Sequence, residues 1–275
     1  MKENMIIIYD FDGTLTPYSL PQYEIIKKCG YDDNKLIERI KNEINANNSL
    51  NLYQAYFKCY VDILKEHNIE LNMDSICLGV DKTRFNKSVE EYFNRMQFSK
   101  TGIKHYIITS GIKEYVKRTS IGSLVNDIYG VTFKRDGEKI TEIDFLVTDK
   151  KKVDIIKEIA QENSNKNIVY LGDGLTDADA FEYVHSISGK SIFIMANNDA
   201  IENYKKLKKQ GIIDEGFDAD FSEGSDLDNF LKVLINFWIC NNSLKILILV
   251  LDKIYTINGK RQATLESLPL TVFFY

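Results

Sequence analysis

The chain has 275 residues and a formal net charge of −5, with 44% hydrophobic and 27% charged residues. This balance is typical of a globular protein, and the lack of a basic stripe argues against a nucleic-acid partner. Four cysteines without CxxC spacing argue against a zinc site or a disulfide framework, so we expect reduced thiols and a cytoplasmic protein. The apolar stretch 244–251 falls far short of the about twenty residues of a membrane helix, so we expect no membrane span.

The first predicted element is the apolar run 5–9, which indicates a short buried strand. Asp10 and Asp12 follow it directly, and Gly13 comes next. In a parallel sheet, ligands bind just beyond the carboxyl ends of the strands, so both acids would lie where a ligand sits. Asp and Gly are also ordinary turn residues, and the partners found further along the chain decide in favour of a site.

Residues 17–99 are predicted to form a helical insertion between two pieces of one sheet. Apolar residues recur there at helical spacing, and no β-rich run interrupts them. An aromatic stripe within this segment is expected to form its core rather than to bind a ligand. Its members are Tyr53, Tyr56, Phe57 and Tyr60.

A second strand is predicted at 105–108, followed by Thr109, Ser110 and Gly111 and then by a helical pattern. A helix that starts beside Ser110 would direct its N–H groups and its dipole at the strand ends, an arrangement that binds phosphate. Ser110 could also serve simply as an N-cap. The alternating segment 129–147 predicts a β-hairpin with an Asp-Gly turn, which would be either a flap over the site or an edge hairpin.

Three consecutive lysines, 150–152, precede a predicted helix, and a third strand follows at 168–171. That strand ends in a glycine-rich turn that carries Asp173 and Asp177. A fourth strand is predicted at 191–195, a short fifth at 219–221, and a helix from 225 to about 236. Residues 237–275 form a tail that could dock on the core, dock on another subunit or be poorly ordered.

The predicted strand ends therefore bring several carboxylates together. At about 4 Å and an effective dielectric constant of about 20, each like-charged pair costs roughly 4 kcal/mol, so the cluster needs a cation. Ligands that are all oxygen atoms, beside a phosphate site, indicate Mg²⁺. Lys152 adds a positive charge, and the group as a whole suits a phosphate dianion and its transfer.

Four short segments, in this order, resemble the phosphatases of the haloacid dehalogenase (HAD) superfamily, in particular the phosphoserine-phosphatase-like branch. They are Asp10 to Thr16, Ser110 with Gly111, a lysine opening a helix, and Gly172 to Asp177. The resemblance implies an α/β fold, a Rossmann-like parallel sheet with helices on both faces and a mostly helical cap inserted after the first strand. The catalytic core would comprise 1–16 and 100–236, the cap 17–99, and the role of 237–275 stays open.

The resemblance also implies a role for each matching residue. Asp10 would be the nucleophile that forms an aspartyl-phosphate, and Asp12 would be the general acid and then the general base. Asp10, the backbone carbonyl of Asp12 and Asp173 would hold Mg²⁺, with Asp177 orienting these ligands. The phosphoryl oxygens would be bound by Ser110, Gly111 and Lys152. Lys152 is chosen because it directly precedes the predicted helix and lies four residues before Ile156, although Lys150 or Lys151 could serve.

The function that follows is a Mg²⁺-dependent phosphomonoesterase of a small phosphorylated metabolite, because the resemblance implies an acid at Asp12 in phosphatases and not in dehalogenases. The alternatives are a phosphotransferase with the same intermediate and a non-catalytic relative that binds metal or phosphate. Recognition of phosphoserine would need charged residues from the cap, and each available one is expected on the surface. These residues are Glu24, Arg39, Arg84 and Arg95. The substrate and the oligomeric state stay open.

Overall fold

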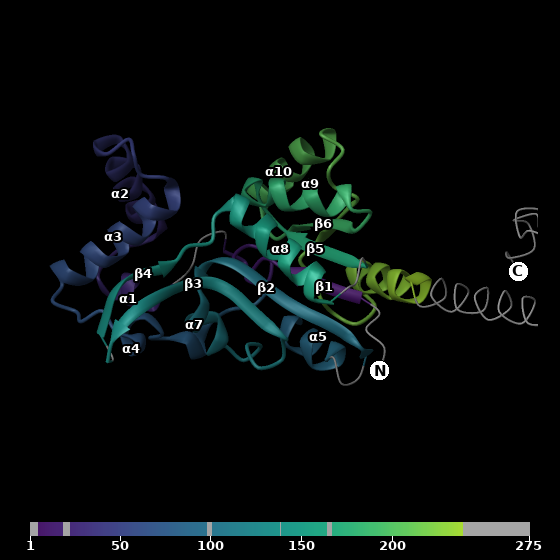
Figure 1. Ribbon diagram of the computed structural model, residues 1–275, viewed down its shortest axis with the longest axis horizontal. Helices are drawn as coiled ribbons and strands as arrows, with labels where there is room; N and C mark the ends of the chain where they lie inside the picture. The colour runs from purple at the N-terminus through teal and green to yellow at the C-terminus, as the bar shows by residue number, and fades with distance from the viewer. Residues whose placement is uncertain (1–4, 19–22, 98–100, 138, 164–166, 239–275) are drawn as a thin grey trace, which may run out of the picture. The chain divides into compact units, whose positions relative to one another are not determined.

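The structure is a computed structural model that describes residues 5–18, 23–97, 101–137, 139–163 and 167–238. The elements discussed below belong to the compact unit Met1–Lys232. Within the described residues, a seven-stranded sheet has the strand order β4-β3-β2-β1-β5-β6-β7 (Figure 1). The strands are β1 Met5–Tyr9, β2 Ile103–Ile112, β3 Asp127–Asp136, β4 Lys139–Phe145, β5 Ile168–Gly172, β6 Lys190–Met195 and β7 Glu215–Asp218.

The sheet is parallel except at one edge, where β4 runs antiparallel to β3. β1 lies between β2 and β5, with Ile8 paired to Tyr106 on one side and to Tyr170 on the other. All five residues of β1 are buried, as expected for a strand covered on both faces. Because the chain leaves β1 and β5 at the same edge of the sheet, Asp10 and Asp173 emerge side by side.

Helices cover both faces of the sheet. Their bounds are α1 Glu24–Lys28, α2 Asp33–Ala46, α3 Leu52–Glu66, α4 Met73–Ile76, η1 Val80–Lys82, α5 Val89–Met96, α7 Lys113–Lys117, α8 Asp149–Asn163, η2 Leu175–Asp177, α9 Ala178–Ser186 and α10 Asn198–Lys209. The helices α8, α9 and α10 share one core with residues of β1, β5 and β6, among them Ile8, Tyr170 and Phe193 (Figure 1). On the opposite face, α5 packs on β1 through Tyr92 and Phe93, whose rings contact that of Tyr9.

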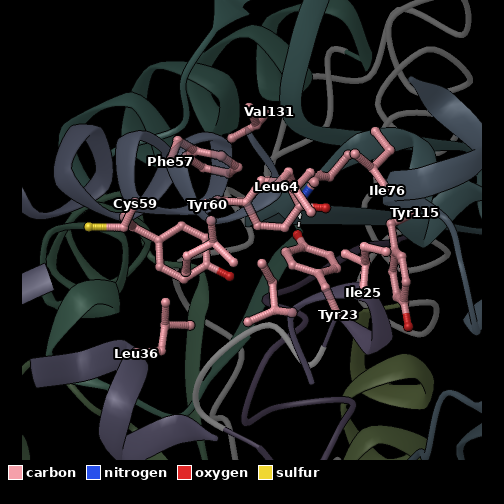
Figure 2. Close-up of a cluster of buried hydrophobic side chains, with 14 of the residues drawn as sticks. Tyr23, Ile25, Leu36, Phe57, Cys59, Tyr60, Leu64, Ile76, Tyr115 and Val131 are labelled. Carbon is pink, nitrogen blue, oxygen red and sulfur yellow. Dashed lines mark hydrogen bonds between the residues drawn. The ribbon is translucent and has the colours of Figure 1, made fainter. Parts of the chain in front are cut away.

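The helices α1 to α4, called the helical block below, have a second core. Figure 2 shows Tyr23, Phe57 and Tyr60 of this core together with Tyr115 of α7 and Val131 of β3. The block is therefore held against the β3–β4 end of the sheet. α3 begins at a capping box, in which the Asn51 side chain accepts from the N–H of Gln54 and the Gln54 side chain accepts from the N–H of Asn51.

The predicted α/β class and the predicted strands 5–9, 168–171 and 191–195 are confirmed. The hairpin around Asp136-Gly137 is confirmed as β3 and β4. The predicted strand at 219–221 is wrong, because the edge strand is β7, Glu215–Asp218. The predicted assignment of 17–99 to a cap stays a prediction, and within that range α5 packs on the sheet.

None of the described helices is both long and apolar enough to cross a bilayer. Three of the cysteines, Cys29, Cys59 and Cys77, are buried free thiols. Most of the tail 237–275, including the apolar stretch 244–251 and Cys240, lies outside the described residues.

Candidate functional site

Asp10 lies at the carboxyl end of the central strand, where its side chain is almost fully buried. Its N–H donates to the carbonyl of Leu171 over 2.8 Å, so the chain leaves β1 still attached to β5. One ligand atom from each of Asp10, Asp173 and Asp177 lies within 4.8 Å of the others. The sequence predicted this convergence, and the structure brings these three acids together.

Lys152 is the cation at the centre of this cluster. Its Nζ donates to Asp10 Oδ1 over 2.7 Å and to Asp177 Oδ1 over 2.6 Å. The structure puts Lys152 inside α8, which begins at Asp149, and not before the helix as the sequence suggested. Lys152 lies on the buried side of α8 with Ile155, Ile156 and Ile159, because these positions follow it at helical spacing.

Neither of the other two candidate lysines is placed like Lys152. Lys151 is half-buried, with its Nζ 3.8 Å from a carboxylate oxygen of Asp154, and its ammonium lies over the ring of Phe145. Lys150 is exposed. Of the three consecutive lysines, Lys152 is the one that contacts the acidic cluster.

Asp177 is held by four hydrogen bonds that use both of its oxygens. Oδ1 accepts from Lys152 and from the Tyr170 hydroxyl, each over 2.6 Å. Oδ2 accepts from the backbone N–H groups of Asp173 and Gly174, each over 3.2 Å. Since its lone pairs are used in this way, Asp177 fixes the turn that carries Asp173. Tyr170, which sequence reasoning did not single out, belongs to this arrangement.

The charges in the cluster are not balanced by protein groups alone. Burial, the largest influence, raises the pKa of Asp10 to about 7 although the charge of Lys152 opposes it. Burial and the charges of Asp10 and Asp177 raise the pKa of Asp173 well above its usual value. Burial lowers the pKa of Lys152, but Asp10 and Asp177 outweigh it and hold that pKa well above the usual range. Asp10 and Asp173, buried next to each other, offer the carboxylate oxygens that a hard divalent cation such as Mg²⁺ prefers, while Asp177 is occupied by its hydrogen bonds.

Asp12 lies beside this cluster and is half-buried. Burial and the charge of Asp10 raise the pKa of Asp12 to about 8. Its Oδ2 accepts from the Thr109 hydroxyl over 3.4 Å. A carboxyl group whose pKa lies near neutrality is suited to donate a proton and later to accept one.

Two glycines allow the segments around these acids to approach closely. Gly13 has φ of +86°, and a Cβ there would lie 2.0 Å from Asp173 Oδ2. At Gly111, a Cβ would lie 3.2 Å from Asp12 Oδ2. Only glycine combines the left-handed conformation with the space needed at position 13, so this residue sets the distance between the β1 and β5 loops.

The segment around Ser110 differs from the prediction. The helix was expected to start beside Ser110, but β2 continues to Ile112, and α7 starts at Lys113 and has five residues. The Gly111 N–H donates to Thr109 Oγ1 over 2.8 Å, and the Ile112 N–H donates to the Tyr23 hydroxyl over 2.8 Å. The helix N-terminus therefore does not lie beside Ser110, because the pairing of Ile112 with Val131 of β3 extends the strand past this point.

Tyr53 joins the helical block to the carboxyl edge of the sheet. Its hydroxyl donates to Asp149, the first residue of α8, and it also interacts with Ser110. The aromatic stripe was expected to be core, and Tyr56, Phe57 and Tyr60 are indeed buried. Tyr53 is half-buried instead, at the exposed end of the stripe. Its position in the first turn of α3, two residues after the N-cap Asn51, was the available signal.

Two cavities meet at Asp12. One, of about 200 Å³, is lined by Asp10, Asp12, Ser110 and Lys152 and by α2 and α3. The other, of about 290 Å³, is lined by Asp12, Gly111 and charged residues that include Glu24 and Arg84. Arg84 is exposed, as expected for a surface residue, whereas Glu24 is half-buried, and both line this cavity. Arg39 pairs with Glu66 and Arg95 with Asp228, so these two form ion pairs elsewhere.

Known proteins share this fold. No family model matches the chain. An uncharacterized protein of Borreliella burgdorferi is 24% identical, and the match covers 84% of this chain and 96% of that protein. Similar solved structures include a phospho-aspartyl intermediate analogue of phosphoserine phosphatase, with 20% identity, a TM-score of 0.56 and coverage of 84% of this chain and 99% of that one.

Two further structures extend the likeness. A substrate-bound phosphoserine phosphatase is 21% identical with a TM-score of 0.57, and the match covers 85% of this chain and 99% of that chain. A HAD family hydrolase from Salmonella enterica serovar Typhi is 17% identical with a TM-score of 0.58, and the match covers 80% and 69%. The chain therefore has the fold of the phosphoserine phosphatases and HAD family hydrolases, as its motifs predicted.

Proposed function

We propose that this chain is a Mg²⁺-dependent phosphomonoesterase that acts on a small phosphorylated metabolite through an aspartyl-phosphate on Asp10. One observation carries the proposal: Asp10, Asp173 and Asp177 converge at the carboxyl edge of the sheet, where the buried Lys152 pairs with Asp10 and Asp177. Solved structures with this fold include a phosphoserine phosphatase with a phospho-aspartyl intermediate analogue and another with bound substrate, which supports the same chemistry here.

The first half of the reaction transfers the phosphoryl group to the enzyme. A carboxylate oxygen of Asp10 attacks phosphorus, and the bond between phosphorus and the ester oxygen breaks. Asp12, whose pKa is about 8, gives its proton to the departing alkoxide. Lys152 holds Asp10 in position through Oδ1.

The second half restores the enzyme. Asp12, now ionised, takes a proton from a water molecule, and the resulting hydroxide attacks the phosphorus of the aspartyl-phosphate. The bond between phosphorus and Asp10 breaks, which releases inorganic phosphate and the Asp10 carboxylate. Asp12 is again protonated and ready for the next ester.

The remaining groups bind and shield the phosphoryl group. Asp10, the Asp12 carbonyl and Asp173 would hold Mg²⁺, with Asp177 fixing the loop of Asp173. The bound ion would neutralise charge on the phosphoryl oxygens. Lys152 and Ser110 would contact the same oxygens, and Gly111 would do so only after its N–H leaves Thr109. The helical block would act as the cap that excludes water.

The test is phosphate release from p-nitrophenyl phosphate by the purified full chain. We expect turnover with MgCl₂, none with excess EDTA, and a loss of at least about a thousandfold in kcat for Asp10→Asn. Asp154→Asn is the matched control, because this exposed acid on α8 lies outside the cluster. Activity of Asp10→Asn equal to that of the control would contradict the proposal. Phosphate appearing on an added alcohol would instead identify a phosphotransferase.

A further inference from the structure

The smaller of the two cavities is continuous with the proposed phosphoryl site. It has a volume of about 200 Å³, and its floor contains Asp10, Asp12, Ser110 and Lys152. The larger cavity touches Asp12 and Gly111 but does not include Asp10, Ser110 or Lys152 among its lining residues. A phosphoryl group held at Asp10 would therefore direct its leaving group into the smaller cavity, past Asp12.

The wall of this cavity opposite the acids is apolar. It is made by one face of α2 and the start of α3, and its apolar residues are Ile37, Ile40, Ile44, Leu52 and Phe57. The rings of Tyr53 and Tyr56 also line it. The isoleucines recur at helical spacing along α2, so they present one continuous stripe. Leu52 is 52% exposed, and Ile37 and Ile44 are half-buried. When an apolar group covers apolar surface that is otherwise open to water beside a reactive centre, the free energy of the complex falls.

The charged residues of this cavity do not suit an amino group. Among the described residues that line it, Asp10 and Asp12 are the only carboxylates, and both are used by the proposed reaction. Lys41, which is exposed, adds a positive charge at the wall. An ammonium group on the substrate would be desolvated here without a counter-charge of its own, which is unfavourable. The carboxylate and the guanidinium that could hold a zwitterion, Glu24 and Arg84, line the other cavity.

We propose, resting on the function proposed above, that the substrate is the phosphate ester of an alcohol with an apolar group, about one aromatic ring or branched aliphatic chain in size. An apolar cavity of about 150 Å³ is enough to hold benzene, and this cavity has about 200 Å³, part of which the phosphoryl group takes. A phosphorylated amino acid such as phosphoserine is disfavoured at this site.

The test compares three phosphate esters of primary alcohols, whose intrinsic reactivities are similar: benzyl phosphate, O-phosphoserine and O-phosphoethanolamine. With the full chain and MgCl₂, we expect kcat/KM for benzyl phosphate to exceed that for either amino compound by at least about tenfold. Higher kcat/KM for phosphoserine would overturn the inference and leave the proposed phosphatase intact. Hydrolysis of p-nitrophenyl phosphate but of none of the three would overturn the inference alone, and hydrolysis of none of the four would overturn both.

A pair of variants tests whether the isoleucine stripe is responsible. Ile37→Glu puts a carboxylate in the apolar wall, and we expect it to shift the ratio of kcat/KM toward phosphoethanolamine and away from benzyl phosphate by at least about tenfold. Ile201→Glu is the matched control, because Ile201 is a 37% exposed isoleucine on α10 that does not line the cavity. An equal change in both variants, or an unchanged ratio in Ile37→Glu, would overturn the inference. Circular dichroism melting checks that both variants are folded.

Discussion

The Nζ of Lys152 donates to Asp10 Oδ1 over 2.7 Å, although the two residues are 142 positions apart in the sequence. Both side chains are almost fully buried, and Asp177 receives a second bond from the same ammonium. A buried ion pair contributes little net stability, but removing one partner leaves an uncompensated charge. The contact therefore couples the carboxyl edge of the sheet, where the proposed active site lies, to the stability of the whole fold.

Replacing Lys152 with Met should lower the free energy of unfolding by about 3–5 kcal/mol at pH 7.5 in EDTA, because Asp10 and Asp177 would remain buried without a counter-charge. The loss should shrink as the pH falls, since the Asp10 carboxyl group, with a pKa of about 7, can then take up a proton. Urea unfolding followed by fluorescence measures the effect at each pH.

Lys151→Met is the control for this experiment, because Lys151 is partly exposed and its ion pair with Asp154 is long. We expect less than about 1 kcal/mol from that change. Equal stability of the two variants would mean that the ion pairs of Lys152 do not form in solution.

Gly13→Ala should abolish activity and the stabilisation by Mg²⁺, because a Cβ at this position would overlap the Asp173 carboxylate. The backbone there, with φ of +86°, adds a strain of about 1–2 kcal/mol for any side chain. Gly30→Ala separates the two effects, because Gly30 has φ of +81° but no atom within 4 Å of its added Cβ. Assays of phosphate release should show normal activity for Gly30→Ala and none for Gly13→Ala. Equal activities would show that Asp173 is not displaced.

The acids of the site could be predicted from the sequence because each directly follows an apolar run. Buried parallel strands end at a common edge, so Asp10 and Asp173 were expected to meet once the runs 5–9 and 168–171 were recognised as strands of one sheet. The structure makes these two strands direct neighbours. Lys152 could be chosen from three candidates by its spacing to Ile156, which the burial of both residues supports. Local periodicity was enough in these cases because the site lies where regular elements end.

The predictions that failed concern residues whose contacts are with residues distant in the sequence. The end of β2 was misplaced because Ile112 pairs with Val131, and no local pattern encodes that pairing. Tyr53 was taken as core because its helical spacing matches that of Tyr56 and Tyr60, yet it contacts Asp149, which is 96 positions away. Glu24 and Arg84 carry no local signal that they line a cavity with Asp12.

His105 should make the protein less stable at mildly acidic pH. Its Nε2 lies 2.8 Å from the carbonyl of Met96, which can only accept, so Nε2 carries the proton and Nδ1 accepts from the Tyr9 hydroxyl at 2.9 Å. Burial lowers the pKa of His105 to about 4, so the unfolded chain takes up a proton before the folded one does. The contribution to stability is complete above pH 6.5 and falls by about 3 kcal/mol as the pH drops to 4.

Asp10 changes the stability in the opposite direction as the pH falls. Its pKa is raised, so protonation removes the cost of a buried carboxylate and stabilises the folded chain. The effect of His105 must therefore be isolated by comparison with His105→Gln, which keeps a donor and an acceptor but does not titrate. We expect the variant to be less stable at pH 7 and to lose less stability between pH 7 and pH 5. Parallel curves of unfolding free energy against pH would rule out a buried neutral imidazole.

Mg²⁺ should stabilise the folded chain, because Asp10 and Asp173 repel each other in its absence and the unfolded chain has no such cluster. Binding adds about 2.7 kcal/mol when the free ion is present at one hundred times its dissociation constant. The gain should be smaller at pH 6 than at pH 8, since Asp10, with a pKa of about 7, must lose its proton to bind the ion. This stabilisation is measured by thermal unfolding with MgCl₂ or EDTA at both pH values. Asp154→Asn is the control and should keep the full shift. Asp173→Asn should remove most of the shift, and a full shift in that variant would place the ion elsewhere.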